Sequence, residues 1–207
     1  MPDMSNVIDR ATFWSLYAGK APWDIGKPQE PFIAAADLVV GPVLEAGCGS
    51  GEIALFFAAE GHQVTGIDFL SKPIRMARSK ADERGLSAHF IVKDALALYD
   101  WDERFASVID CGLFHVFSND DRRRYVEGLS AVLAPGGRLF LMCFSDLEPA
   151  GKGPRRVSRQ ELLDVFAEGF EVELIKPSRF EVNTESTEFA FSEGGPKAWF
   201  AIFRRKA

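Results

Sequence analysis

The sequence is poor in cysteine and has no cysteine pattern that could organise a fold. Cys48, Cys111 and Cys143 make an odd number, and no Cys-x-x-Cys pair occurs. A disulfide framework needs an even, paired set, so this usage favours free thiols in a reducing, cytoplasmic environment.

Histidine is equally sparse, and the three residues are not arranged as metal ligands. His62, His89 and His115 are far apart in the chain and form no helical pair of ligand spacing. The sequence therefore predicts no metal, either structural or catalytic.

Three further features are missing, and each excludes a class of protein. No apolar run is long enough to cross a membrane. Residues 1–10 lack the apolar core that directs secretion. Basic residues are not in excess, since the formal net charge is −6, and an acidic chain does not attract polyanions. We therefore expect no membrane or nucleic-acid partner, and a monomer or homodimer that acts on a small molecule.

What the sequence does contain is an alternation of short apolar strands with amphipathic helices. The chain has 207 residues, 47% of them hydrophobic, which suits one domain with a sizeable core. The alternation predicts an α/β fold of the doubly wound, Rossmann-like type, with a mostly parallel seven-stranded sheet and an antiparallel last strand. The expected strands are 42–46, 62–67, 88–92, 105–111, 138–144, 170–176 and 198–204, with helices at 50–60, 71–84 and 119–133.

The boundaries of these elements follow from capping and turn residues. Ser71, and either Asn119 or Asp120, are expected to cap two of the helices. Ser158 is expected to cap a further helix through a capping box with Glu161. Residues 135–137, Pro-Gly-Gly, are expected to form a turn before the fifth strand.

Residues 1–40 precede the first strand and are rich in aromatic side chains. We expect one or two helices there, with a loop at 19–31, lying as a lid across the open end of the sheet. The whole chain, 1–207, is then a single domain whose core is 41–207.

The most informative motif is E-A-G-C-G-S-G, from Glu45 to Gly51, between a strand and a helix. Alternate glycines allow a sharp bend and a close approach to a ligand, and the helix start presents free N–H groups. The dinucleotide pattern G-x-G-x-x-G does not fit, because Glu52 stands at its third glycine and a carboxylate opposes a pyrophosphate. The Walker pattern does not fit either, because no Gly-Lys-Ser/Thr follows.

This motif resembles motif I of the class I S-adenosylmethionine-dependent methyltransferases. The resemblance covers residues 40–145 and includes A-V-L-A-P-G-G-R-L at 131–139. It implies that the cofactor is S-adenosyl-L-methionine and that the product is S-adenosyl-L-homocysteine. It also implies that Gly47, Cys48 and Gly49 hold the methionine part of the cofactor.

An acidic residue lies at or just beyond the end of each of the first three expected strands. The resemblance implies a role for each of them. Glu45 lies close to the cationic amino end of the cofactor. Asp68, in V-T-G-I-D-F, binds the ribose hydroxyls, and Phe69 packs on the adenine. Asp94, with the N–H of Ala95, meets the adenine edge. A lone Asp after a strand is usually a turn residue, but three acids after three successive strands favour a binding rim.

Other motifs narrow the resemblance to enzymes that act on small molecules. Residues 13–29, F-W-S-L-Y-A-G-K-A-P-W-D-I-G-K-P-Q, are similar to the opening of thiopurine and halide/thiol methyltransferases. D-C-G-L-F-H-V-F at 110–117 and C-F-S-D at 143–146 resemble mycobacterial-type enzymes that methylate heterocyclic toxins such as hydroxyquinolones. The resemblance favours O-methylation of a small aromatic heterocycle.

The acceptor is expected at the mouth that follows the fourth strand, where Cys111 and His115 lie. An imidazole with the ordinary pKa of about 6.5 can remove a proton from an acceptor oxygen, so His115 is the candidate base. Tyr17 and Asp146 are the other candidate catalytic residues, and Asp146 is a candidate to orient either His115 or Tyr17. Trp23 and Cys111 complete the expected cofactor set. The aromatic face of Trp23 can attract a sulfonium cation.

The residues leave several alternatives open. His115 can instead be a structural residue bonded to the backbone. The acceptor can be a thiol, a thiopurine or a halide, which needs no base when it arrives ionised. A protein of another class, such as an NAD-dependent reductase or a nucleotide-binding module without catalysis, is a further alternative. Glu52 argues against the reductase, and so does the lack of a Tyr-x-x-x-Lys pair.

Overall fold

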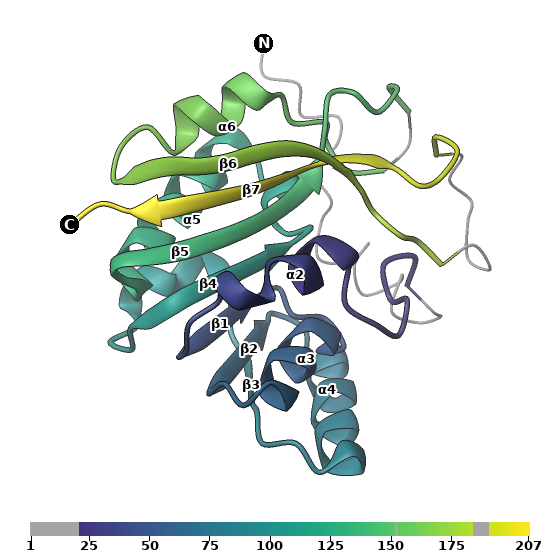
Figure 1. The fold of residues 1–207 in the computed structure, drawn as a ribbon, viewed down its shortest axis with the longest axis vertical. Helices are drawn as coiled ribbons and strands as arrows, with labels where there is room; N and C mark the ends of the chain where they lie inside the picture. The colour runs from purple at the N-terminus through teal and green to yellow at the C-terminus, as the bar shows by residue number, and fades with distance from the viewer. Residues whose placement is uncertain (1–20, 152, 184–190) are drawn as a thin grey trace.

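The computed structural model describes residues 21–151, 153–183 and 191–207, which form one seven-stranded sheet covered by helices (Figure 1). The strands are β1 (Val43–Ala46), β2 (Val64–Asp68), β3 (His89–Val92), β4 (Phe105–Cys111), β5 (Leu133–Phe144), β6 (Phe170–Arg179) and β7 (Lys197–Arg205). Their order is β3-β2-β1-β4-β5-β7-β6. All neighbours are parallel except the two pairs that involve β7. The predicted fold class is therefore confirmed.

Helices cover both faces of the sheet, and a hydrophobic core lies under each layer. One layer contains α2 (Glu30–Ala34), α3 (Glu52–Ala59) and α4 (Ser71–Arg84). The other contains η2 (Ala95–Asp100), α5 (Asn119–Val132) and α6 (Arg159–Val165). Figure 1 shows α2 and α3 in front of the sheet and α5 behind it. A sheet buried on both faces needs apolar residues at successive positions, which explains the continuous apolar runs.

Strand β5 shows how one run serves both cores. Its side chains alternate between the two faces. Leu139 and Leu141 pack with α5 and α6, whereas Phe140, Met142 and Phe144 pack with the α2–α4 layer. Four of these five side chains are fully buried, and Phe144 is 6% exposed.

Helix starts differ from the expected ones in three places. Helix α5 is capped by Ser118, whose Oγ accepts the N–H of Asp121 at 3.1 Å. The prediction that Asn119 or Asp120 caps it is wrong, because the chain becomes helical one residue earlier. The capping box of Ser158 with Glu161 at the start of α6 is confirmed.

Ser71 is also not a cap. It is the first residue of α4, and the preceding residue Leu70 is the N-cap, without a capping side chain. The carboxylate of Asp68 accepts the N–H of Leu70 at 2.8 Å and so shapes the turn instead. Helix α3 begins at Glu52, because Gly51 before it has a positive φ of 85°.

The turn predicted at 135–137 is a bulge inside β5. Pairing with β4 passes from Phe105↔Leu133 directly to Ser107↔Arg138. The residues between leave the ladder, and Gly136 takes a φ of 77° that favours glycine. Half of the expected lid, residues 1–20, lies outside the described residues. Of the remainder, α2 packs on the sheet, with the ring centroids of Phe32 and Phe200 5.4 Å apart.

The strand order determines where a ligand can bind. From β1 the chain moves outward to β2 and β3, and it then returns to β4 on the other side of β1. Crossovers that leave in opposite directions open a crevice at the carboxyl ends of the strands.

None of the described helices is long and apolar enough to cross a bilayer.

Candidate active site

A cavity of about 190 Å³ lies at this crevice. Its walls come from the loops after β1, β2 and β4, from the end of β5, and from segments 22–29 and 180–182. Most of the sequence-predicted site residues that the structure describes line it: Trp23, Glu45, Gly47, Cys48, Gly49, Asp68, Phe69, Cys111 and His115. The crossover point of the sheet therefore coincides with the residues singled out from the sequence.

The glycine loop after β1 bends as the motif requires. Gly47, Gly49 and Gly51 have φ values of 70°, 53° and 85°, which other residues rarely adopt. A Cβ on Gly51 would lie 2.8 Å from the Cβ of Ala77 in α4. The third glycine therefore allows the end of the loop to lie closely against α4.

Glu45 supplies a buried carboxyl at the floor of the cavity. The residue is 3% exposed, and its Oε2 accepts the N–H of Ala54 at 2.8 Å. Burial is the main cause that raises the pKa of Glu45 to about 8, and the charge of Asp68 adds to it. A buried carboxyl of this kind is stabilised as its anion by a cation, so it fits the ammonium end of an amino-acid ligand.

Asp68 ties the first two loops together. Its Oδ2 accepts the N–H of Gly49 at 3.2 Å, and its Oδ1 accepts the N–H of Leu70 at 2.8 Å. The carboxylate is 7% exposed and lines the cavity beside Phe69. This position at the end of β2 fits a ribose, and the adjacent phenyl ring fits an adenine.

Cys48 contributes shape to the loop and no reactive thiolate. Burial is the main cause that raises the pKa of its thiol well above the ordinary value. Trp23 also lines the cavity and is 38% exposed. In the described part of the chain, no cluster of three or more His, Cys, Asp or Glu is placed to hold a metal ion.

Asp94 and Ala95 are not among the residues that line the cavity. The carboxylate of Asp94 accepts the N–H of Leu96 at 2.9 Å and caps η2. Asp94 thus has the turn role that an Asp after a strand usually has. A contact of Asp94 with the adenine stays a prediction.

Aromatic side chains enclose the other end of the cavity, around His115 in η3 (Phe114–Val116). The imidazole centroid lies 5.0 Å from the ring of Phe144 and 6.0 Å from that of Phe180. Phe191 meets Phe144 at 5.6 Å, and all three phenyl rings line the cavity. An enclosure of aromatic rings suits a flat, apolar acceptor.

His115 is held from within the protein. It is 4% exposed, and its Nδ1 accepts the backbone N–H of Phe144 at 2.9 Å. Burial lowers the pKa of His115 to about 3, and the positive charges of Arg122 and Arg156 lower it further. The imidazole is therefore neutral at physiological pH.

The structure does not bring Asp146 to His115. Asp146 follows β5, is exposed, and accepts the indole N–H of Trp199 at 3.3 Å. The described contacts join Asp146 to Trp199 and His115 to the Phe144 N–H, and none joins Asp146 to His115. A catalytic role of Asp146 stays a prediction. Trp199, on the neighbouring strand β7, holds the Asp146 carboxylate outside the cavity lining. The other candidate catalytic residue, Tyr17, lies outside the described residues.

The turn that carries His115 is fixed by buried polar contacts. Asp110 is the residue before the last one of β4, and its carboxylate accepts the N–H groups of Leu113 and Phe114. The phenol of Tyr125 in α5 donates to the same carboxylate at 3.0 Å. Because these residues are buried, breaking the set would leave unpaired polar groups in the core.

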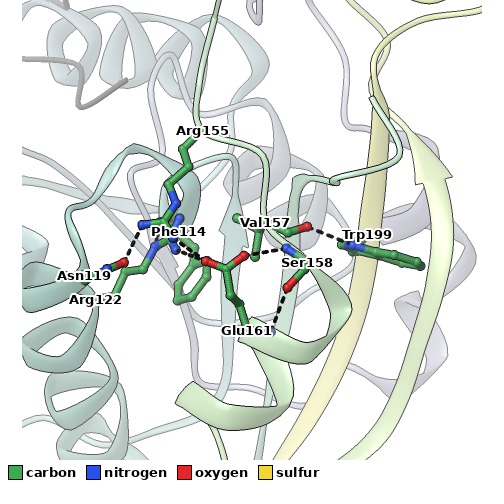
Figure 2. Close-up of polar contacts among 8 residues, drawn as sticks. All are labelled: Phe114, Asn119, Arg122, Arg155, Val157, Ser158, Glu161 and Trp199. Atoms are coloured by element: carbon green, nitrogen blue, oxygen red, sulfur yellow. Dashed lines mark hydrogen bonds and ion pairs between the residues drawn. The ribbon is translucent and has the colours of Figure 1, made fainter. Parts of the chain in front are cut away.

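Arg122 anchors the same turn from α5. Its Nε donates to the carbonyl oxygen of Phe114 at 3.3 Å, and its guanidinium lies 4.7 Å from the Phe114 ring centroid. Figure 2 shows Glu161 reaching from α6 to Arg122, to Arg155 and to the backbone of Ser158. This cluster connects the loop before α6, part of which lines the cavity, to the turn that carries His115.

Several cavity residues could not be identified from sequence motifs. Phe180 and Phe191 reach the site because β6 and β7 pair as an antiparallel hairpin at the sheet edge. Gln29 exchanges two hydrogen bonds of 2.9 Å with the backbone of Glu181 and so pins segment 22–29 beside that hairpin. Such long-range pairings have no local motif, although the apolar spacing of β6 and β7 indicates a hairpin.

Comparisons with known proteins agree with this geometry. A family model described as a methyltransferase domain matches residues 43–137. The chain is 33% identical to the 2-heptyl-1-hydroxyquinolin-4(1H)-one methyltransferase of Mycobacteroides abscessus over 195 residues, which cover 92% of this chain and 84% of that protein. It is 29% identical to probable thiol methyltransferase 2 of Arabidopsis thaliana over 160 residues, 74% of this chain and 70% of that protein.

Solved structures extend the similarity over nearly the whole chain. One, from work on the conversion of a disulfide bond into a thioacetal group during echinomycin biosynthesis, is 37% identical, with a TM-score of 0.83. The alignment covers 96% of this chain and 93% of that one. The glycine loop, the acids at the carboxyl ends of β1 and β2, and these relatives lead to one conclusion: the chain belongs to the S-adenosylmethionine-dependent methyltransferases.

Proposed function

We propose that this enzyme transfers the methyl group of S-adenosylmethionine to an oxygen of a small, flat, aromatic heterocycle. An acceptor of the 1-hydroxyquinolin-4(1H)-one type is favoured, because the relative from Mycobacteroides abscessus is named for such a compound. The observation that carries the proposal is the enclosure of the cavity by Phe144, Phe180 and Phe191, beside the loop after β4.

The proposed cofactor end is the part of the cavity formed by the glycine loop. Glu45 would hold the ammonium group, Asp68 the ribose and Phe69 the adenine, with Trp23 and Cys111 along the walls. S-adenosylmethionine supplies a methyl group that is already activated on a sulfonium. The protein then has to position the acceptor and exclude water, and positioning of this kind can contribute about 7–11 kcal/mol to catalysis.

A panel of acceptors with labelled cofactor tests the proposal. We expect turnover of 2-heptyl-1-hydroxyquinolin-4(1H)-one, with the label on the N-hydroxyl oxygen. The matched quinolone that lacks the N-hydroxyl group should not be methylated at that position. Exclusive labelling of nitrogen or carbon, or no turnover of any hydroxylated heterocycle, would contradict the proposal.

Sulfur is the second candidate for the atom that receives the methyl group. It is supported by the similarity to a probable thiol methyltransferase and to the protein from echinomycin biosynthesis. Aromatic thiols, a thiopurine and iodide therefore belong in the same panel. A kcat/KM for a thiol that exceeds that for every oxygen acceptor would favour this second function.

A further inference from the structure

We propose that His115 is a fixed hydrogen-bond donor and not a base, and that the enzyme selects acceptors that arrive as oxyanions. The inference rests on the proposed function, because it concerns the acceptor end of the same cavity. It names the class of acceptor: a hydroxyl attached to an aromatic heterocycle that loses its proton to water near neutral pH.

The first support is the tautomer of the imidazole. A backbone N–H can only donate, so the 2.9 Å contact from the Phe144 N–H requires a lone pair on Nδ1 of His115. A neutral imidazole with a free lone pair on Nδ1 carries its proton on Nε2. His115 lines the cavity, and no described residue bonds to Nε2. Nε2 therefore offers one N–H group and no lone pair.

The second support is the environment of the ring. To act as a base, His115 would have to accept its second proton and become a cation. Two phenyl rings meet the imidazole edge to face, and the ring is almost completely buried. The charged groups that act on it are Arg122 of α5 and Arg156 of the loop before α6, and both are positive. This environment opposes a cationic imidazole and favours an anion beside it.

The third support is rigidity. Phe114, the residue before His115, is held through both of its backbone groups. Its carbonyl oxygen accepts a hydrogen bond from Arg122, and its N–H donates to the carboxylate of Asp110. The imidazole ring itself is held by the Phe144 N–H, which donates to its Nδ1. A donor that is fixed before the ligand arrives needs no reorganisation when charge moves during the reaction.

The chemical step balances without an enzymic base. The hydroxyl proton passes to water before the acceptor binds. The oxyanion then attacks the methyl carbon, an O–C bond forms as the S–C bond breaks, and the sulfonium becomes a neutral thioether. An anion and a cation are converted into two neutral products, and His115 keeps its Nε2 proton throughout.

The state of the ring can be measured without activity. In ¹⁵N-labelled protein bound to S-adenosylhomocysteine, we expect His115 to show the Nε2–H tautomer and not to titrate between about pH 5 and about pH 8. The spectra of His62→Gln and His89→Gln assign the other two rings, which serve as internal controls. An Nδ1–H tautomer, or a titration midpoint of His115 within that range, would overturn the proposal.

The kinetic test separates a donor from a base. His115→Gln keeps an N–H donor and cannot act as a base, so we expect it to retain much more activity than His115→Ala, by about tenfold or more in kcat/KM. The exposed variant His89→Gln is the matched control and should equal the parent. A thermal shift with S-adenosylhomocysteine confirms that each variant is folded. Equal losses in the two His115 variants would overturn the donor role.

The pH profile tests the class of acceptor. The test uses two acceptors that the enzyme methylates and whose hydroxyl pKa values differ by about two units. The midpoint of the pH profile of kcat/KM should differ between them by the same amount. If the midpoint of the kcat/KM profile is the same for both acceptors, the selection of oxyanions is overturned. If no acceptor is methylated on oxygen, the proposed function fails, whereas the spectroscopic result still decides the state of His115.

Discussion

Burial moves two ionisable side chains of the site toward neutrality, one from each direction. It raises the pKa of Glu45 to about 8 and lowers that of His115 to about 3. Glu45 lies beside the glycine loop, where a cation can restore its charge. His115 lies among phenyl rings and guanidinium groups, where a positive charge has no support. The same physical cause therefore prepares one residue to meet a cation and the other to donate a hydrogen bond.

The first prediction concerns Glu45→Gln, which removes this carboxylate. We expect at least about tenfold weaker binding of S-adenosylhomocysteine, because the lost partner is a buried charged group. A cation favours the ionised carboxylate, so the affinity of the parent should rise as the pH increases from about 6 to about 8, where Glu45 ionises. Calorimetry across this range measures both effects.

A matched control for this prediction is Glu60→Gln, at the exposed end of α3. It should bind with the affinity and the pH dependence of the parent. Binding by Glu45→Gln that equals the parent at every pH would remove Glu45 from the cofactor site.

At the scale of single elements, the glycine loop shows why one position tolerates no side chain. Gly51 and Gly61 have nearly the same backbone conformation, with φ values of 85° and 89°. They differ in space, because a Cβ on Gly51 would lie 2.8 Å from Ala77, whereas a Cβ on Gly61 would meet nothing within 4 Å. Close packing of the loop against α4, and not the turn alone, therefore requires the third glycine.

The second prediction compares Gly51→Ala with Gly61→Ala. Both introduce a residue with positive φ, which costs about 1–2 kcal/mol. Gly51→Ala adds a steric overlap that costs typically about 1–3 kcal/mol more, and the shift it forces in the loop should weaken cofactor binding. Urea unfolding and calorimetry provide the measurements. Equal stability and equal affinity in the two variants would show that the contact between Gly51 and α4 is not limiting.

The third prediction concerns the capping box of α6. Ser158→Ala removes the Oγ that accepts the N–H of Glu161 at 3.1 Å, and loss of such a cap costs about 1 kcal/mol. Ser79→Ala, at an exposed position inside α4, should be neutral or slightly stabilising, because alanine favours a helix interior. Urea midpoints compare the two variants, and a Ser158→Ala midpoint no lower than that of Ser79→Ala would contradict the role of the cap.

The strands could be predicted because the signal for them lies in neighbouring residues of the chain. Continuous apolar runs mark strands buried on both faces, and β4 occupies the range expected for it. The caps were less predictable where several capping residues adjoin. Ser118, Asn119, Asp120 and Asp121 can all cap a helix, and Ser118 is the cap because its backbone is extended whereas the next three residues are already helical. The bulge at 135–137 arises from pairing with β4, which a local turn pattern does not reveal.

At the scale of the whole molecule, the site exists because the sheet gathers distant segments at one edge. The ends of β1, β2 and β4 come together at the crossover point, and the hairpin of β6 and β7 adds a wall from the far edge. A ligand that contacts all of these segments should bind the folded state alone and therefore stabilise it.

The fourth prediction is a thermal shift. S-adenosylhomocysteine at about one hundred times its Kd should stabilise the folded state by about 2.7 kcal/mol. For a chain of this size, that corresponds to a rise in Tm of about 5–10 °C. NAD⁺ at the same concentration should cause no shift, because Glu52 stands near the position of a pyrophosphate. Absence of a shift with S-adenosylhomocysteine, or an equal shift with NAD⁺, would contradict the assigned cofactor site.

The sequence by itself determined the order of the elements, the glycine loop and the acids Glu45 and Asp68, because each of these depends on neighbours along the chain. Only the tertiary structure decided the partner of Asp146, the aromatic wall from Phe180 and Phe191, and the state of His115. The group that bonds Nδ1 of His115 lies 29 residues away, and burial depends on every element packed around the ring. A pKa and a tautomer follow from that three-dimensional surrounding, so no local pattern in the chain can reveal them.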